Sequence, residues 1–364
     1  MESPKRQKIK GTQRSTSRLI RRFALRGLWG FVALLVIEYF VLPELSGAQR
    51  ALSLISRANY ALVTAGIIAE AAALYSFAKL TEVMVPRPRP SLWTLLRIDL
   101  ASLSVSHVLP GGTASGSGLS LRLLSSAGLR TTDAGFAIAT QGIGSAVVLN
   151  LILWISLIIS IPINGFNSLY LSVALLGVVV IALFGGLILL FTRGEERVAR
   201  LLDRLGKRVP YLSRFDFTTA VQRIAERLND LRSDPVLLRG GIFWATMNWL
   251  FDAACLWLML AAFGRWVDPD SLLVAYAIAN VLAVLPLTPG GLGVVEAFAT
   301  LALVKFFGTP RSIAILGVIA WRLFNFWLPI PVGVGSYISL KISAGEAPED
   351  VTMELDKLRL DPPE

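Results

Sequence analysis

The sequence LPLTPGG, at residues 285–291, places two prolines and two adjacent glycines inside a long apolar run. A shorter version, VLPGG at residues 108–112, occurs earlier in similar surroundings. The prolines Pro110 and Pro289 are separated by about half of the 364-residue chain, which indicates an internal repeat. Because proline and adjacent glycines end helices, each motif predicts a broken helix. In transporters, paired breaks of this kind point to the substrate site.

The composition is typical of a protein that crosses a membrane several times. Hydrophobic residues make up 54% of the chain, the mean hydropathy is +0.63, and only 16% of the residues are charged. Residues 134–192 contain no charged side chain. This length is enough for two spans, because one span needs about 20 residues. We therefore predict an all-α polytopic membrane protein.

The net charge of +10 is interpreted as a membrane feature and not as a sign of nucleic-acid binding. Basic residues in membrane proteins set the orientation of the chain and bind anionic headgroups. We therefore expect anionic membrane lipids as partners, no nucleic acid and no cofactor. The single cysteine, Cys255, excludes an intramolecular disulfide.

The apolar runs predict a set of spans, in which each broken pair has two segments: 27–42, 60–78, 92–109 with 116–127, 135–161, 168–191, 240–263, 271–287 with 292–307, and 313–340. With the N-terminus inside, this topology places 28 Lys and Arg residues on the inner side and four on the outer side. This asymmetry agrees with the positive-inside rule. We therefore predict a multi-pass protein of the inner or plasma membrane with both termini in the cytoplasm.

The predicted domains follow from this topology. They are a basic cytoplasmic N-terminus at 1–26, a transmembrane domain at 27–341 and a flexible cytoplasmic tail at 342–364, with a basic cytoplasmic linker at 193–239 inside the transmembrane domain. The two broken pairs enter the membrane from opposite sides, so the repeats are predicted to be inverted. Backbone groups freed by Pro and Gly cannot face lipid. The site is therefore expected near the midplane, between the repeats.

Ionisable residues inside spans are hypotheses for function, because each costs at least about 2.5 kcal/mol at the bilayer centre. The candidates for substrate binding combine such residues with the residues of the breaks: Gly111, Gly112, Arg122, Pro289, Gly290, Gly291, Glu296 and Arg322. The candidates for a coupling or a structural role are Glu70, Asp99, His107 and Asp252. No catalytic or metal-binding residue is predicted, because one His and one Cys argue against nucleophilic or metal chemistry.

These candidates also have structural interpretations, and the residues alone leave both open. Glu296 and Arg322 alternatively form a buried pair that only fixes packing. The glycines of the first break alternatively serve close helix packing, whereas amides at a helix N-terminus equally suit an anionic headgroup. Glu70 and Asp252 alternatively cap a helix or pair with linker arginines.

Two motifs carry a resemblance to a known family. The sequence LTPGGLGVVE, residues 287–296, resembles the signature of the lysylphosphatidylglycerol synthase transmembrane-region family, also called flippase-like or uncharacterised protein family 0104. The stretch from LPGG at residues 109–112 through Arg122 to Gly128 is similar to the family's first motif. The resemblance covers roughly residues 26–340. Members often carry Gly-Glu before the arginine of the first motif, whereas this chain has SGSG at residues 115–118 and no acid there.

The resemblance implies an inner-membrane protein related to the flippase half of a lipid-aminoacylating enzyme. In that enzyme a soluble aminoacyl-transferase domain follows the membrane region. This sequence ends at Glu364, so the resemblance implies a stand-alone form without the transferase domain.

The favoured hypothesis is a lipid flippase that moves an anionic or modified (glyco)phospholipid between leaflets. In it, amides of the two breaks hold the headgroup phosphate, Arg122 and Arg322 pair with it, and Glu296 pairs with a cationic headgroup or with Arg322. No ATP-binding loop of the form Gly-x-x-x-x-Gly-Lys-Ser/Thr occurs, so the drive would come from gradients or another protein. We expect Arg322→Ala or Glu296→Gln to abolish transport while the protein still folds.

The alternative is an enzyme of lipid-linked sugar transfer, or its membrane partner, suggested by Asp99 and Glu82 near the predicted cytoplasmic face. A non-transporting scaffold is a third hypothesis. Dependence on a divalent metal and a nucleotide-sugar donor would indicate the enzyme. Under the flippase hypothesis, a lipid-modifying enzyme is a candidate partner.

Overall fold

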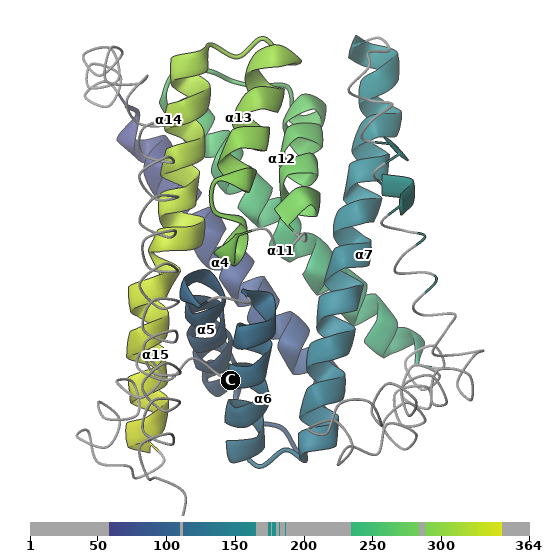
Figure 1. Cartoon of the computed structure of the whole chain (residues 1–364), viewed down its shortest axis with the longest axis vertical. Coiled ribbons are helices and arrows are strands. Elements are labelled where there is room, and N and C mark those ends of the chain that lie inside the picture. Colours follow the sequence, from purple (N-terminus) through teal and green to yellow (C-terminus); the bar gives the residue numbers. More distant parts are fainter. Residues whose placement is uncertain are drawn as a thin grey trace, which may run out of the picture. The chain divides into compact units, whose positions relative to one another are not determined.

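The computed structural model describes residues 58–109, 112–164, scattered positions between 174 and 186, 234–283 and 288–343. The chain divides into two units at Arg57, and all described residues lie in the second unit. The N-terminus and first predicted span, Pro110, Gly111, most of the 168–191 span and of the 193–239 linker, and the tail beyond Ser343 lie outside the described residues. Every regular element that is described is a helix (Figure 1).

The helices follow the predicted order of spans and breaks. The first half contains α4 (Tyr60–Met84), α5 (Leu92–Val108), α6 (Thr113–Ser126) and α7 (Thr131–Asn164). The second half contains α11 (Pro235–Ala262), α12 (Pro269–Ala283), the short turn η2 (Pro289–Gly291), α13 (Val294–Lys305), α14 (Arg311–Arg322), the π-helical turn η3 (Leu323–Trp327) and α15 (Pro329–Ser343). Among the described residues, four helical stretches are long and apolar enough to cross a membrane: Tyr60–Met84, Thr131–Ile163, Pro235–Ala262 and Arg311–Ser343.

Local sequence explains where these helices begin. The Asn59 side chain accepts hydrogen bonds from the backbone N–H groups of Ala61 and Leu62, which caps α4. Asp234 caps α11 in the same way, and the proline that follows it occupies the first helical turn, where a missing N–H has no consequence. The last helix, by contrast, continues through Pro329 because the π-helical turn precedes it.

The two halves pack on each other, and the contacts come in equivalent pairs. Helix α4 packs along its equivalent, α11. The broken-pair helix α5 packs on α15 of the other half, and its equivalent α12 packs on α7 (Figure 1). Each break is therefore held by the long final helix of the opposite repeat. The inverted relation of the repeats stays a prediction.

Glycine makes the contact between α5 and α15 close. A Cβ atom at Gly333 would overlap the backbone carbonyl oxygen of Leu100 and would lie 2.6 Å from Cβ of Ser104. Gly335, two residues further along α15, has no atom within 4 Å of the same position. The backbones of α5 and α15 therefore touch through Gly333, as in small-residue helix contacts within membranes.

We expect Gly333→Ala to lower the thermal unfolding midpoint of the purified protein, because overpacking typically costs about 1–3 kcal/mol. Gly335→Ala is the matched control. It meets open space and removes a helix-interior glycine that costs up to about 1 kcal/mol relative to alanine. Equal midpoints for the two variants would contradict the close contact.

Candidate functional site

The two helix breaks meet. Gly112 and Gly290 both have positive φ angles, +49° and +57°, which glycine adopts without strain. A Cβ atom on Gly112 would lie 3.6 Å from the backbone nitrogen of Gly290. The break between α5 and α6 therefore touches the break between α12 and α13, as expected for a site between the repeats.

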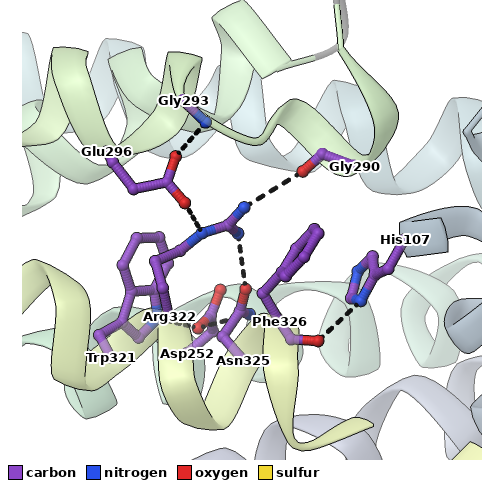
Figure 2. Close-up of polar contacts among 9 residues, drawn as sticks. All are labelled: His107, Asp252, Gly290, Gly293, Glu296, Trp321, Arg322, Asn325 and Phe326. Atoms are coloured by element: carbon purple, nitrogen blue, oxygen red, sulfur yellow. Dashed lines mark hydrogen bonds and ion pairs between the residues drawn. The ribbon is translucent and has the colours of Figure 1, made fainter. Parts of the chain in front are cut away.

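Arg322, at the end of α14, is the centre of the polar contacts at this junction. Its Nε donates to Glu296 Oε1 at 2.6 Å, Nη1 donates to Asn325 Oδ1 at 3.1 Å, and Nη2 donates to the Gly290 carbonyl at 3.3 Å (Figure 2). The guanidinium also lies over the Phe326 ring, 4.4 Å from its centroid. Only 5% of Arg322 is exposed. Its charge is therefore held by contacts within the protein.

Glu296 has two roles at the start of α13. One carboxylate oxygen binds Arg322, and the other, Oε2, accepts the N–H of Gly293 at 2.7 Å. A helix N-terminus favours a negative group, and here the chain's own carboxylate occupies that position. At the first break, Gly112 precedes α6 without any side-chain cap. We expected the N-termini of both α6 and α13 to bind an anion. At α13, the Glu296 carboxylate already occupies that position.

Asp252, on α11, accepts three hydrogen bonds. The donors are the Tyr276 hydroxyl at 2.6 Å, the Trp321 indole N–H at 2.5 Å and the Asn325 amide at 3.1 Å. Asn325 therefore bridges Asp252 and Arg322 (Figure 2). Glu70 on α4 was the other carboxyl group of this predicted pair. It is buried at the level of Asp252, where α4 packs on α11.

Sequence reasoning missed Asn325, Tyr276 and Trp321. A signal was present for Asn325, because it is a polar residue in the otherwise apolar LFNFW of the last predicted span. The π-helical turn η3 carries Asn325 and Phe326, and such turns are frequent at functional sites. Tyr276 and Trp321 gave no signal, since aromatic residues are common in membrane helices.

His107 also reaches the junction. Its Nδ1 lies 3.0 Å from the carbonyl oxygen of Phe326, and its ring stacks on the Phe326 ring at a centroid distance of 4.2 Å. His107 from the first repeat and Arg322 from the second repeat thus both contact Phe326 of the π-helical turn. The contact of its ring nitrogen with the Phe326 carbonyl fits a structural role for His107.

Two predicted residues lie outside this network. Asp99 accepts a hydrogen bond from Thr81 at 2.8 Å, and Thr81 accepts one from Gln141 at 2.8 Å. Arg122 is exposed on α6, ten residues beyond Gly112 or about 15 Å along the helix. The described contacts do not join Arg122 to Arg322, and the shared phosphate role expected for the two arginines stays a prediction.

Comparison with known proteins identifies the family. The profile of the lysylphosphatidylglycerol synthase TM region matches residues 27–333. The chain belongs to this family. Together with the long apolar helices in the described part of the chain, the match makes it a multi-pass membrane protein.

Curated relatives are similar over parts of their length. A UPF0104 membrane protein of Methanothermobacter thermautotrophicus is 26% identical over 171 residues, which cover 44% of this chain and 50% of the relative. The glycosyltransferase AglD of Haloferax volcanii is 26% identical over 186 residues, covering 48% of this chain and 28% of the relative. The chain thus spans half or less of the length of these relatives.

We expect Gly290→Ala to destabilise the junction, because a Cβ there would lie 2.5 Å from Phe326 Cε2 and 3.0 Å from His107 Cδ2. Gly308→Ala is the control, since Gly308 has a similar φ of +62° and no atom within 4 Å. Both variants incur the left-handed penalty of about 1–2 kcal/mol. Only Gly290→Ala adds overpacking of about 1–3 kcal/mol. Unfolding midpoints that fall equally in both would contradict the close approach.

Proposed function

We propose that this protein is a lipid transporter that moves an anionic or modified (glyco)phospholipid between the leaflets of a cell membrane. The observation that carries the proposal is the contact between two helix breaks beside the buried Arg322. Irregular backbone at membrane depth occurs where it is buried in protein or lines a water-filled cavity. Transporters place their substrate sites at paired breaks of this kind.

Arg322 is the residue proposed to bind the lipid phosphate. A guanidinium offers five N–H donors in a planar fork that matches phosphate geometry. In the structure, Glu296 supplies the negative charge on this fork. A phosphodiester that enters the junction would compete with Glu296 for Arg322, and the displaced carboxylate would keep its bond to the Gly293 N–H. Glu296 thus acts as an internal substitute for the headgroup.

The first break supplies the second part of the proposed headgroup site. Helix α6 begins at Gly112 without a side-chain cap, and Gly112 lies against Gly290, whose carbonyl binds Arg322. The positive end of α6 therefore lies close to the guanidinium. The N-terminal partial charge of a helix stabilises a nearby anion, so one phosphate could bind both groups.

Similarity to a glycosyltransferase favours a second candidate function, which is participation in lipid-linked sugar transfer. Under this alternative the junction would hold the lipid-linked acceptor for a partner enzyme or for this chain. Transfer of sugar to a lipid acceptor that requires a nucleotide-sugar donor and a divalent metal would support it.

We expect the purified protein in liposomes to accelerate transbilayer movement of headgroup-labelled phosphatidylglycerol, and Arg322→Ala and Glu296→Gln to reduce the rate to that of protein-free vesicles. Removing one partner of a buried pair costs about 3–5 kcal/mol. Arg322→Lys is therefore included, because it keeps the positive charge and loses the planar fork.

Arg130→Ala is the matched control for these variants. Arg130 forms an ion pair with Asp133, its side chain is 81% exposed, and it lies between α6 and α7, so its loss should leave the rate unchanged. Size-exclusion profiles check that each variant is folded. Wild-type rates in folded Arg322→Lys and Glu296→Gln proteins would contradict the proposed roles.

A further inference from the structure

Two buried carboxyl groups face each other where α4 packs on α11. Glu70 and Asp252 are 4% and 5% exposed. The two helices run antiparallel, because the Asn59 N–H bonds to the Ala262 carbonyl at one end and Gly240 lies against Val83 at the other, and this brings Glu70 and Asp252 to the same level of the contact. We propose that this pair binds one proton, and that the proton and the anionic lipid headgroup are transported together. The inference rests on the proposed transport function, and it names the coupling ion of that site.

In the described arrangement, the electrostatics of the pair favours one bound proton. Two ionised carboxylates in contact repel strongly in a medium of low dielectric constant, so such pairs share a proton. The titratable groups that face the pair are Cys255 from α11, Tyr276 from α12 and Arg322 from α14. Arg322 is the cation among them, and it is already paired with Glu296.

The hydrogen bonds indicate which carboxyl carries the proton. Asp252 accepts bonds from Tyr276, Trp321 and Asn325, which stabilise an ionised carboxylate. Glu70 has an oxygen, Oε2, that is buried and has no hydrogen-bond partner among the described residues. A buried carboxylate oxygen without a donor is costly, whereas a protonated carboxyl tolerates it far better. The proton therefore belongs on Glu70, donated toward Asp252.

The pair is connected to the proposed headgroup site. Asn325 donates to Asp252 and accepts from Arg322, so one side chain joins the carboxyl pair to the guanidinium (Figure 2). A proton on Glu70 removes one negative charge from this network, which reduces the electrostatic repulsion of an anion bound at Arg322. Binding of the proton and binding of an anion therefore favour each other, by the same factor in each direction.

Charge balance gives the stoichiometry. A phosphodiester headgroup such as that of phosphatidylglycerol carries one negative charge, and one proton cancels it. The loaded site then has the same net charge as the empty, deprotonated site. Because moving net charge through the low-dielectric interior is costly, one proton per monoanionic lipid is the favourable ratio.

The first experiment tests the proton without reference to transport. Infrared spectra of the protein in lipid nanodiscs at neutral pH are compared for the wild type, Glu70→Gln and Glu70→Asp. We expect Glu70→Gln to lose one protonated carboxylic-acid carbonyl band and Glu70→Asp to retain it. Identical band intensity in the wild type and folded Glu70→Gln would overturn the proton site.

The second experiment tests the coupling. Vesicles contain phosphatidylglycerol that carries a headgroup label in both leaflets, and the exterior is made acidic. We expect the wild type to drive label inward several-fold faster than in protein-free vesicles with the same gradient, and the direction to reverse with the gradient. Glu70→Gln should lose this response. Arg130→Ala, the control of the transport assay, should keep it, because Arg130, which pairs with Asp133, is exposed and lies between α6 and α7.

The outcomes separate the two proposals. Label that moves equally fast with and without the gradient overturns proton coupling and leaves lipid transport standing. A gradient response that Glu70→Gln retains also overturns it. If no label moves in any condition, lipid transport fails, and the infrared comparison alone supports or overturns the proton site. Should Glu70→Gln fail to fold, the gradient response of the wild type decides the coupling.

Discussion

The buried guanidinium of Arg322 is the constraint on which the rest of the junction depends. A cation at membrane depth is tolerated only when it is paired and hydrogen-bonded. Glu296 from α13, Gly290 from the second break and Asn325 from the π-helical turn together meet this requirement. These partners come from separate elements, so satisfying one charge fixes how the second broken pair sits on the last helix.

The glycines of the breaks make this arrangement sterically feasible. Gly290 needs a positive φ, and it also needs space, because Phe326 and His107 fill the volume that a Cβ would occupy. Gly112, which precedes α6 without a side-chain cap, lies against Gly290, and the Gly290 carbonyl accepts a hydrogen bond from Arg322. In the proposed lipid site, a headgroup phosphate and the internal carboxylate of Glu296 compete for the same cationic partner, Arg322. This competition is the physical basis of the proposed lipid site. The neighbouring pair of carboxyl groups, Glu70 and Asp252, is the proposed binding site of the coupled proton.

Several features of the breaks and of the candidate site could be predicted from particular residues of the sequence. The repeated Pro-Gly-Gly motif predicted two breaks, and the cost of charge in a span singled out Glu296, Arg322, Glu70 and Asp252. A Glu296–Arg322 pair that only fixes packing was one of two open interpretations. The ion pair is present, with Arg322 buried and Glu296 partly exposed, and its role stays a prediction. Arg122 satisfied the same criterion and yet lies on an exposed face of α6, because a cost argument identifies unusual residues without showing which of them meet.

By itself, the sequence determined the class of protein, the order of its helices and the position of its breaks, since these follow from apolar length, from proline and glycine and from the distribution of charge. Only the tertiary structure decided that the breaks touch, that Glu296 closes one helix start while the other is uncapped, and that Asn325 joins Asp252 to Arg322. Those features depend on contacts between residues far apart in the chain. Their geometry depends on how α4, α11 and the last helix pack together. Local sequence patterns do not predict this packing.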